Sequence, residues 1–119
     1  MFRSSGILLP VSALPGPCGI GDLGADARDF IDFLAAAGQR YWQILPLNPP
    51  DGAHSPYLSA STFAGSTDLL SPEPFVARGA LTADEVRAID WGEDPLRGDY
   101  DRVHEGRTAL WDTAFAREK

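Results

Sequence analysis

Residues 7–47 contain the pattern that most constrains the fold, because two short apolar runs flank an amphipathic stretch. Residues 7–11 and 41–47 are rich in branched and aromatic side chains, which favours buried strands. Between them, residues 26–37 place apolar side chains at helical spacing, and Gly38 follows as a typical helix end. A strand, a helix and a second strand in this order form a βαβ unit, in which a right-handed crossover joins parallel strands. The chain is therefore predicted to belong to the α/β class.

The second half of the chain is predicted to hold a long loop and two helices. Residues 53–74 are small, polar and bounded by proline, which is typical of an ordered loop. Thr82 and Glu85 match a capping box that opens a helix over residues 83–89. From Tyr100 onward, apolar side chains recur at the spacing of one face of an amphipathic helix. The predicted face consists of Val103, Leu110, Trp111, Ala114 and Phe115.

Size and charge exclude several classes of protein. The chain has 119 residues, enough for one small domain or part of one, and it carries no internal repeat. A net charge of −7 with no basic stripe argues against nucleic-acid and anionic-membrane partners. Cys18 is the only cysteine, so no intramolecular disulfide is possible. The apolar run near the N-terminus is too short for a signal sequence or a membrane span, so we expect a cytoplasmic protein.

Residues 19–24 match G-x-G-x-x-G, the fingerprint of dinucleotide-binding folds. Two details oppose that interpretation. Residues 12–18, with two prolines, separate the motif from the preceding strand, whereas the dinucleotide turn is tight. The second strand ends in Leu47-Asn48, where an acidic ribose ligand is expected. The favoured interpretation is a loop whose glycines allow turning and close packing. Nucleotide binding stays an alternative, which saturable binding of a nicotinamide cofactor would support.

The other chemically versatile side chains form no recognisable catalytic or metal-binding pattern. His54 and His104 lie far apart in the sequence, and neither has metal-ligand spacing around it. Cys18 would act as a nucleophile only with a base beside it. Most of the 17 acidic residues fall on predicted helix faces or in residues 93–101, where solvated charge is the simplest explanation. We therefore predict no metal site and no cofactor.

The segment from His54 to Tyr57 is the best candidate for a ligand-binding loop. It follows the second strand, where barrel and doubly wound enzymes place such loops. The Ser55 hydroxyl can match sugar hydroxyls, and Tyr57 offers a flat aromatic face to sugar C–H groups. Pro56 restricts the backbone between them. The alternative is an ordinary turn whose tyrosine packs on the sheet.

Several segments in this order carry a resemblance to a known family. They are residues 6–16 (GILLPVSALPG), 19–24 (GIGDLG), 30–34 (FIDFL), 41–47 (YWQILPL), Ser55-Pro56-Tyr57 with residues 63–65 (FAG), and Asp99-Tyr100. Together they resemble the amylomaltases, the alpha-glucanotransferases of glycoside hydrolase family seventy-seven, over nearly the whole chain. The resemblance implies a (β/α)8 TIM barrel. It also implies a retaining transfer of alpha-1,4-glucan segments between maltooligosaccharides, without a cofactor.

The resemblance also assigns parts of the chain. Residues 1–119 would be the truncated N-terminal part of the catalytic barrel, since such a barrel needs about 250 residues. Residues 75–119 would begin a helical insertion. The nucleophile, the acid/base and the stabilising carboxylate are expected downstream of Lys119, so no catalytic residue is assigned here. Tyr57 matches the family's tyrosine that lines the sugar site next to the cleaved bond, and Ser55 matches its neighbour. The expected partners are an alpha-1,4-glucan or maltooligosaccharide and the remainder of the barrel.

One departure from the family pattern precedes the Ser-Pro-Tyr motif. Members usually read glycine, tyrosine, glycine, aspartate there, whereas this chain reads Asp51-Gly52-Ala53-His54. The tyrosine that helps to bind a second glucan chain is thus replaced near Gly52.

Two further alternatives stay open. One is a related starch hydrolase, which uses the same carboxylates but admits water. The other is a stand-alone carbohydrate-binding or interaction module.

Overall fold

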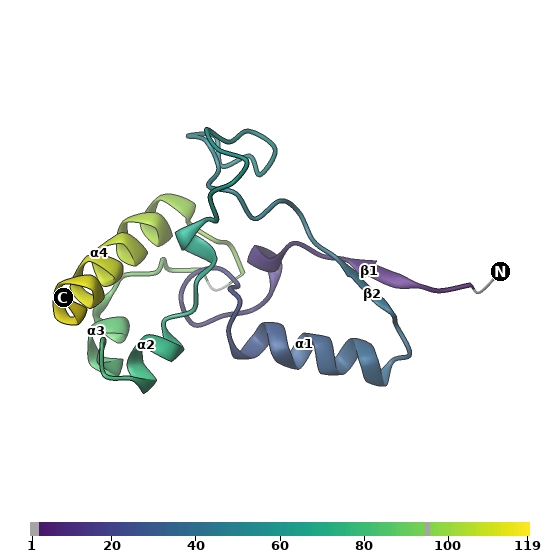
Figure 1. The fold of residues 1–119 in the computed structure, drawn as a ribbon, viewed down its shortest axis with the longest axis horizontal. Helices are drawn as coiled ribbons and strands as arrows, with labels where there is room; N and C mark the ends of the chain where they lie inside the picture. The colour runs from purple at the N-terminus through teal and green to yellow at the C-terminus, as the bar shows by residue number, and fades with distance from the viewer. Residues whose placement is uncertain (1–2, 95) are drawn as a thin grey trace.

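The predicted βαβ unit is present in the computed structural model, which describes residues 3–94 and 96–119 (Figure 1). Strands β1 (Gly6–Leu8) and β2 (Tyr41–Gln43) pair in parallel, with Ile7 opposite Trp42. Helix α1 (Ala25–Ala36) makes the crossover between them. The prediction of an α/β arrangement for these residues is therefore confirmed.

Both strands are shorter than predicted, and the cause is proline. Beyond β1, the Leu9 amide still donates to the carbonyl of Gln43 at 3.0 Å. Pro10 then begins the 3-10 turn η1 (Val11–Ala13), and Pro46 has no amide with which to continue β2. The chain therefore leaves the sheet earlier than its apolar runs suggest.

Helix α1 packs on the strands through a few side chains. The ring of Phe30 meets the ring of Trp42 edge-on, with centroids 5.1 Å apart. The indole of Trp42 in turn donates to the carbonyl of Leu9 at 2.8 Å. Leu34 is buried on the same helix, and Gly38 ends it with a φ of 72°, as predicted.

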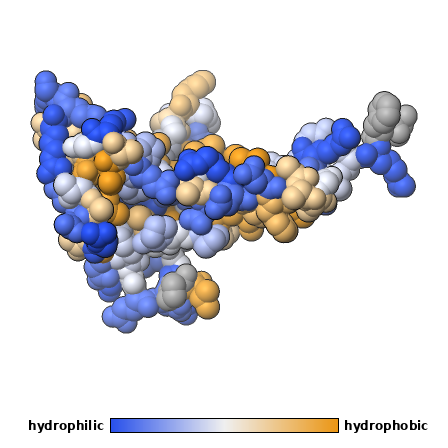
Figure 2. Space-filling view, turned by 90° about the horizontal axis from the view of Figure 1, so that it is seen from below, coloured by the Kyte–Doolittle hydropathy of each residue, from blue (hydrophilic) through white to orange (hydrophobic). Residues whose placement is uncertain are grey.

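The two-stranded sheet is not buried, contrary to the prediction of buried strands. Ile7, Leu8 and Tyr41 are exposed on the strands, and Ile31 and Phe33 are exposed on α1. Figure 2 shows hydrophobic surface along this half of the molecule, beside hydrophilic residues. Parallel sheets are normally covered on both faces, whereas the described residues leave most side chains of this sheet exposed.

A second part of the molecule is a cluster of three helices, α2 (Glu73–Ala77), α3 (Ala83–Ala88) and α4 (Tyr100–Glu118) (Figure 1). Its core contains small and aliphatic side chains from these helices and the turn between α2 and α3, flanked by aromatic rings. The buried members are Ala80, Leu81, Leu110 and Ala114.

The predicted capping box opens α3. The Thr82 hydroxyl accepts from the Glu85 amide at 3.2 Å, and the Glu85 carboxylate accepts from the Thr82 amide at 2.8 Å. Sequence analysis missed α2, because its five residues are too few to show a period, with Pro72 directly before them and Pro74 among them. Residues 53–74 were expected to be loop, yet they contain the 3-10 turn η2 (Thr67–Leu69) and the start of α2.

Helix α4 begins at Tyr100 as expected, but its buried face differs from the predicted one. Phe115 is 64% exposed, whereas Gly106 and Arg107 are buried beside Val103. Trp91 packs against Gly106 so closely that a Cβ there would lie 3.1 Å from its ring. The buried face of α4 therefore includes Gly106 and Arg107, and Phe115 lies outside the core. Among the described residues no helix has the length and hydropathy that crossing a membrane requires.

Candidate functional site

The segment that follows β2 forms a closed excursion, residues 48–66, visible above the rest of the fold in Figure 1. Its base is closed by the Ser66 amide, which donates to the carbonyl of Leu47 at 2.7 Å. The Asn48 side chain reaches across the base and donates to the carbonyls of Ser61 and Ala64 at 3.0 and 3.3 Å. Residues 48–66 are thus ordered by side-chain hydrogen bonds at the neck, without regular secondary structure between β2 and η2.

Within this excursion, Asp51 organises a compact turn. One carboxylate oxygen accepts from the amides of Ala53 and Ser55, at 3.1 and 3.3 Å. Its carbonyl accepts from the His54 amide, and its own amide donates to the carbonyl of Leu58, both at 2.9 Å. Aspartate favours such turns because its short side chain can substitute for a backbone acceptor. We call residues 51–58 the Asp51 turn.

The two predicted sugar-binding residues both lie on the Asp51 turn. The Ser55 hydroxyl accepts from the Tyr57 amide at 3.4 Å, which leaves its own hydrogen available to another acceptor. The Tyr57 side chain is 71% exposed, so the alternative in which this tyrosine packs on the sheet is wrong. The turn therefore presents a hydroxyl and an aromatic ring close together, and the ring faces solvent.

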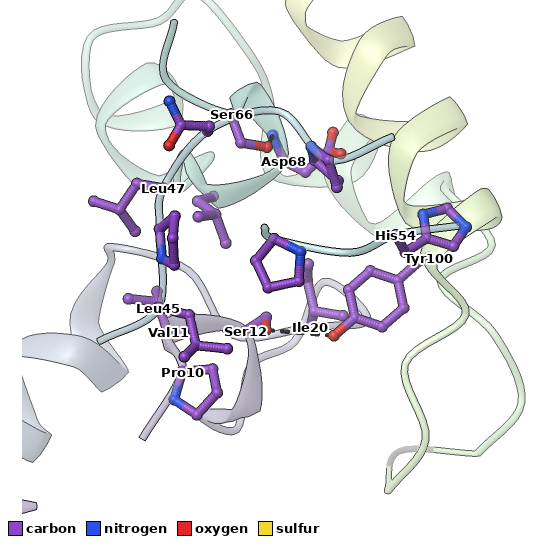
Figure 3. Close-up of a pocket in the computed structure, with 15 residues that line it drawn as sticks. Pro10, Val11, Ser12, Ile20, Leu45, Leu47, His54, Ser66, Asp68 and Tyr100 are labelled. Atoms are coloured by element: carbon purple, nitrogen blue, oxygen red, sulfur yellow. Dashed lines mark hydrogen bonds between the residues drawn. The ribbon is translucent and has the colours of Figure 1, made fainter. Parts of the chain in front are cut away.

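A cavity of about 180 Å³ lies beside the turn, between the loops that follow β1 and β2 (Figure 3). Apolar side chains such as Ile20 and Leu45 line most of it, with Ser12 and Tyr100 among the polar groups. Neither Ser55 nor Tyr57 lines it, although Pro56 between them does. The two predicted residues are therefore not part of its wall.

His54, which the sequence placed in the candidate loop without a role, contributes to the wall of this cavity. Its ring stacks on the ring of Tyr100, with centroids 5.3 Å apart, and its Nε2 lies 3.1 Å from a carboxylate oxygen of Asp101. The Tyr100 hydroxyl donates to the Ser12 hydroxyl at 3.3 Å (Figure 3). The only sequence signal was the departure from the family pattern at this position. Both histidines lie where α4 meets earlier parts of the chain. His54 contacts Asp101 on α4, and His104 on α4 pairs with Asp68 at 3.0 Å.

The structure gives no support to metal or cysteine chemistry in this region. In the part of the chain that is described, no group of three or more histidine, cysteine, aspartate or glutamate side chains could hold a metal ion. Burial raises the pKa of the Cys18 thiol, and the charge of Arg107 only partly opposes that effect. A buried thiol with a raised pKa is a poor nucleophile, because the thiolate is the reactive form.

The glycine motif serves packing. Gly21 lies against the backbone of Leu14, where a Cβ would come within 2.6 Å of the carbonyl oxygen. The Gly24 amide donates to the Asp22 carboxylate at 2.9 Å, and the Ala25 amide donates to the Glu73 carboxylate at 3.2 Å. Two carboxylates thus occupy the amides at the start of α1 that a phosphate would need. This arrangement argues against the nucleotide-binding interpretation.

The edge of the sheet explains why these loops meet. Parallel strands end at the same edge, so the segments after β1 and β2 lie together and enclose the cavity (Figures 1 and 3). Ligand-binding loops of α/β proteins lie at this carboxyl edge. The fold and the site thus define an α/β segment with a cavity at the carboxyl edge of its strands.

Comparison with known proteins assigns the family. A family model described as 4-alpha-glucanotransferase matches residues 9–119. The 4-alpha-glucanotransferase of Streptococcus pneumoniae is 43% identical over 115 residues, which cover 97% of this chain and 23% of that protein. The 4-alpha-glucanotransferase of Thermus thermophilus is 43% identical over 113 residues, which cover 95% of this chain and 22% of that protein. The chain belongs to the 4-alpha-glucanotransferase family.

A solved structure agrees with this assignment. An amylomaltase from Streptococcus agalactiae, in complex with acarbose, matches with a TM-score of 0.92 and 37% sequence identity. The match covers 97% of this chain and 23% of that one. The chain thus spans less than a quarter of the length of these relatives.

Proposed function

We propose that these residues act within a 4-alpha-glucanotransferase, which transfers alpha-1,4-glucan segments between maltooligosaccharides in the cytoplasm. The family assignment supports the reaction class. The observation that carries the site is the exposed ring of Tyr57 beside the Ser55 hydroxyl, on a loop at the carboxyl edge of two parallel strands.

The proposed ligand is an alpha-1,4-glucan or maltooligosaccharide. A pyranose ring presents flat patches of C–H groups as well as hydroxyls, so it is recognised by an aromatic face together with hydrogen-bonding groups. Tyr57 supplies the aromatic face, and Ser55 can donate its free hydroxyl hydrogen to a sugar oxygen. Pro56 fixes φ between them and thereby limits the conformations of the pair.

We place the bond-breaking chemistry elsewhere in the protein. In a retaining transfer, the alpha-1,4 bond breaks as a carboxylate bonds to the sugar and an acid protonates the leaving oxygen. An acceptor sugar hydroxyl then displaces the carboxylate and gives its proton to the acid group, which now acts as a base. We propose that the nucleophile, the acid/base and the stabilising carboxylate come from residues downstream of Lys119. The residues described here would then orient the substrate.

We further propose that β1, α1 and β2 are the first units of a (β/α)8 barrel, and that residues 75–119 begin a helical insertion. The exposed apolar side chains of β1 and α1 support this proposal, since Ile7, Leu8 and Phe33 would be buried by further strands and helices of the barrel. The remainder of the barrel is thus the expected partner of this surface.

The protein translated from the complete reading frame tests the activity. Incubated with maltotriose alone, it should produce both shorter and longer maltooligosaccharides, which chromatography resolves. The Tyr57→Ala substitution should lower kcat/KM roughly tenfold, equivalent to about 1.4 kcal/mol. Tyr57→Phe keeps the ring and should stay close to wild type.

Phe115→Ala is a suitable control, because Phe115 is another exposed aromatic ring but lies on α4, away from the Asp51 turn. It should leave kcat/KM unchanged. Release of glucose without longer products would identify a starch hydrolase instead. Binding of maltotriose without any new product would identify a carbohydrate-binding module.

A further inference from the structure

His54 connects the Asp51 turn to the rest of the protein. Every other hydrogen bond that the described residues show for positions 51–58 has both partners inside this turn. The contact between His54 and Asp101 is the exception, and it reaches the first turn of α4. The stacking of His54 on Tyr100 adds a second contact to the same turn of α4.

The backbone of His54 reflects this connection. Its φ is 56°, which makes it the one non-glycine residue with a positive φ in residues 3–94 and 96–119. That conformation is unfavourable for a residue with a side chain, so contacts of the side chain must offset it. In this conformation the imidazole lies against α4, where it stacks on the ring of Tyr100 (Figure 3) and contacts the carboxylate of Asp101.

The anchor on α4 is itself held in place. The Tyr100 hydroxyl donates to Ser12, in the turn that follows β1. The Asp99 side chain caps α4 by accepting from the Arg102 amide at 3.2 Å. Contacts of His54 thus tie the Asp51 turn, through Tyr100, to both the helix and the loop after the first strand.

We propose that His54 is a positioning residue for sugar binding: its contacts with Tyr100 and Asp101 hold Ser55 and Tyr57 at the carboxyl edge of the sheet. This inference rests on the proposed function of the Asp51 turn. The ring of His54 covers one face of Tyr100. We therefore assign to Tyr100 the role of supporting the Asp51 turn.

His54→Asn tests the proposal in the protein translated from the complete reading frame. Asparagine accepts a positive φ more readily than most residues, so this change removes the ring contacts while sparing the backbone conformation. We expect amide hydrogen exchange at Ala53 and Ser55 to accelerate about tenfold. The KM for maltotriose should rise about fivefold with kcat nearly unchanged, because substrate and transition state lose the same contact.

Asp101 and His104 provide the comparison variants. Asp101→Ala should reproduce part of both effects, and Asp101→Asn, which keeps an acceptor oxygen, should restore wild-type values. The side chain of Asp101 is 86% exposed, so neither change should disturb folding. The Asp101 variants therefore still test the proposal if His54→Asn fails to fold. His104→Asn removes a similar imidazole–carboxylate pair on the same helix, outside the Asp51 turn, and should change neither measurement.

The two readouts separate the possible failures. Unchanged exchange at Ala53 and Ser55 in His54→Asn would overturn the anchor, whether or not the protein acts on glucans. Faster exchange with an unchanged KM would overturn the positioning of sugar contacts. If the wild-type protein transfers no glucan, the proposed function fails, and the exchange experiment alone still decides whether His54 anchors the turn.

Discussion

The guanidinium of Arg107 donates a hydrogen bond to the carboxylate of Asp22 at 3.1 Å, although 85 positions separate the two residues. The Arg107 side chain is fully buried, and it also donates to the carbonyls of Leu70 and Cys18. One charged group on α4 therefore joins the glycine-rich loop to the segment between η2 and α2. Among the described residues its Nε has no hydrogen-bond partner, which fits a group held chiefly by its terminal nitrogens.

Replacing Arg107 should destabilise the fold strongly. Arg107→Met leaves the nearly buried Asp22 carboxylate without its counter-charge, so the free energy of unfolding should fall by about 3–5 kcal/mol. Urea denaturation followed by circular dichroism measures the loss. Arg102→Met, which removes an exposed arginine paired with Asp90 and Asp99, should cost less than about 1 kcal/mol. If the free energy of unfolding fell equally in both variants, the buried ion pair of Arg107 would contribute no more to stability than the exposed pairs of Arg102.

The helical cluster should depend on Leu81. This side chain is 2% exposed and belongs to the core between α2, α3 and α4, so Leu81→Ala creates a cavity. We expect a loss of about 2–5 kcal/mol in urea denaturation. Phe115→Ala removes a larger but exposed side chain and should change stability by no more than about 0.5 kcal/mol. The opposite order would show that Phe115 is covered in solution.

Stability at acid pH should depend on Glu85. Hydrogen bonds from Arg117, and then from the Thr82 amide, lower the pKa of Glu85 from 4.5 to about 2. The carboxylate form is therefore favoured in the folded state, so its stabilising contribution is complete above pH 4.5 and is lost as the pH falls towards 2. The urea midpoint of the wild type should therefore decline as the pH is lowered from 4.5 to 2.

Glu85→Gln provides the test of that assignment. Its urea midpoint should change less between pH 4.5 and 2, since the glutamine has no carboxylate to protonate. Glu93→Gln, at an exposed position in the turn before α4, should keep the slope of the wild type. If the Glu85→Gln and wild-type profiles ran parallel, the ion pair with Arg117 would not be the source of the acid sensitivity.

The close packing of the glycine-rich loop gives a further prediction. A Cβ at Gly21 would lie 2.6 Å from the carbonyl oxygen of Leu14 and 2.7 Å from its Cβ, so Gly21→Ala should force the loop to shift. We expect a loss of about 1–3 kcal/mol, visible as a lower Tm. Gly52→Ala meets no atom within 4 Å and should leave Tm nearly unchanged or slightly higher. A Tm for Gly21→Ala equal to that of the wild type would contradict the packing.

The elements that could be predicted from the sequence are those that local interactions determine. The parallel strands follow from the spacing of apolar runs around α1, and Gly38 and the Thr82–Glu85 capping box mark helix ends within a few residues of themselves. The position of Ser55 and Tyr57 on a loop after β2 followed in the same way. Their contact with a sugar stays a prediction.

The remaining features depend on partners distant in the sequence. Arg107 occupies a position on α4 that resembles solvated charge until Asp22 and Leu70 are brought to it. The role of His54 likewise could not be predicted, because its partners Tyr100 and Asp101 lie almost fifty residues away. The exposure of β1 was missed for another reason: an apolar run shows that a strand can be buried, and the surrounding chain decides whether it is.

The closed neck of the excursion bears on how this region can evolve. Leu47 and Ser66 meet by a backbone hydrogen bond, and Asn48 braces the same point from its side chain. The hydrogen bonds at the neck all end on main-chain groups of the loop, so they do not depend on which side chains lie between its ends, and changing the length of a loop with closed ends costs little free energy. Transplanting the segment of a relative that corresponds to residues 49–65 at this neck should therefore keep the loop closed and alter ligand preference. The contacts of His54 with Tyr100 and Asp101 are the part of the scaffold that such an exchange would change.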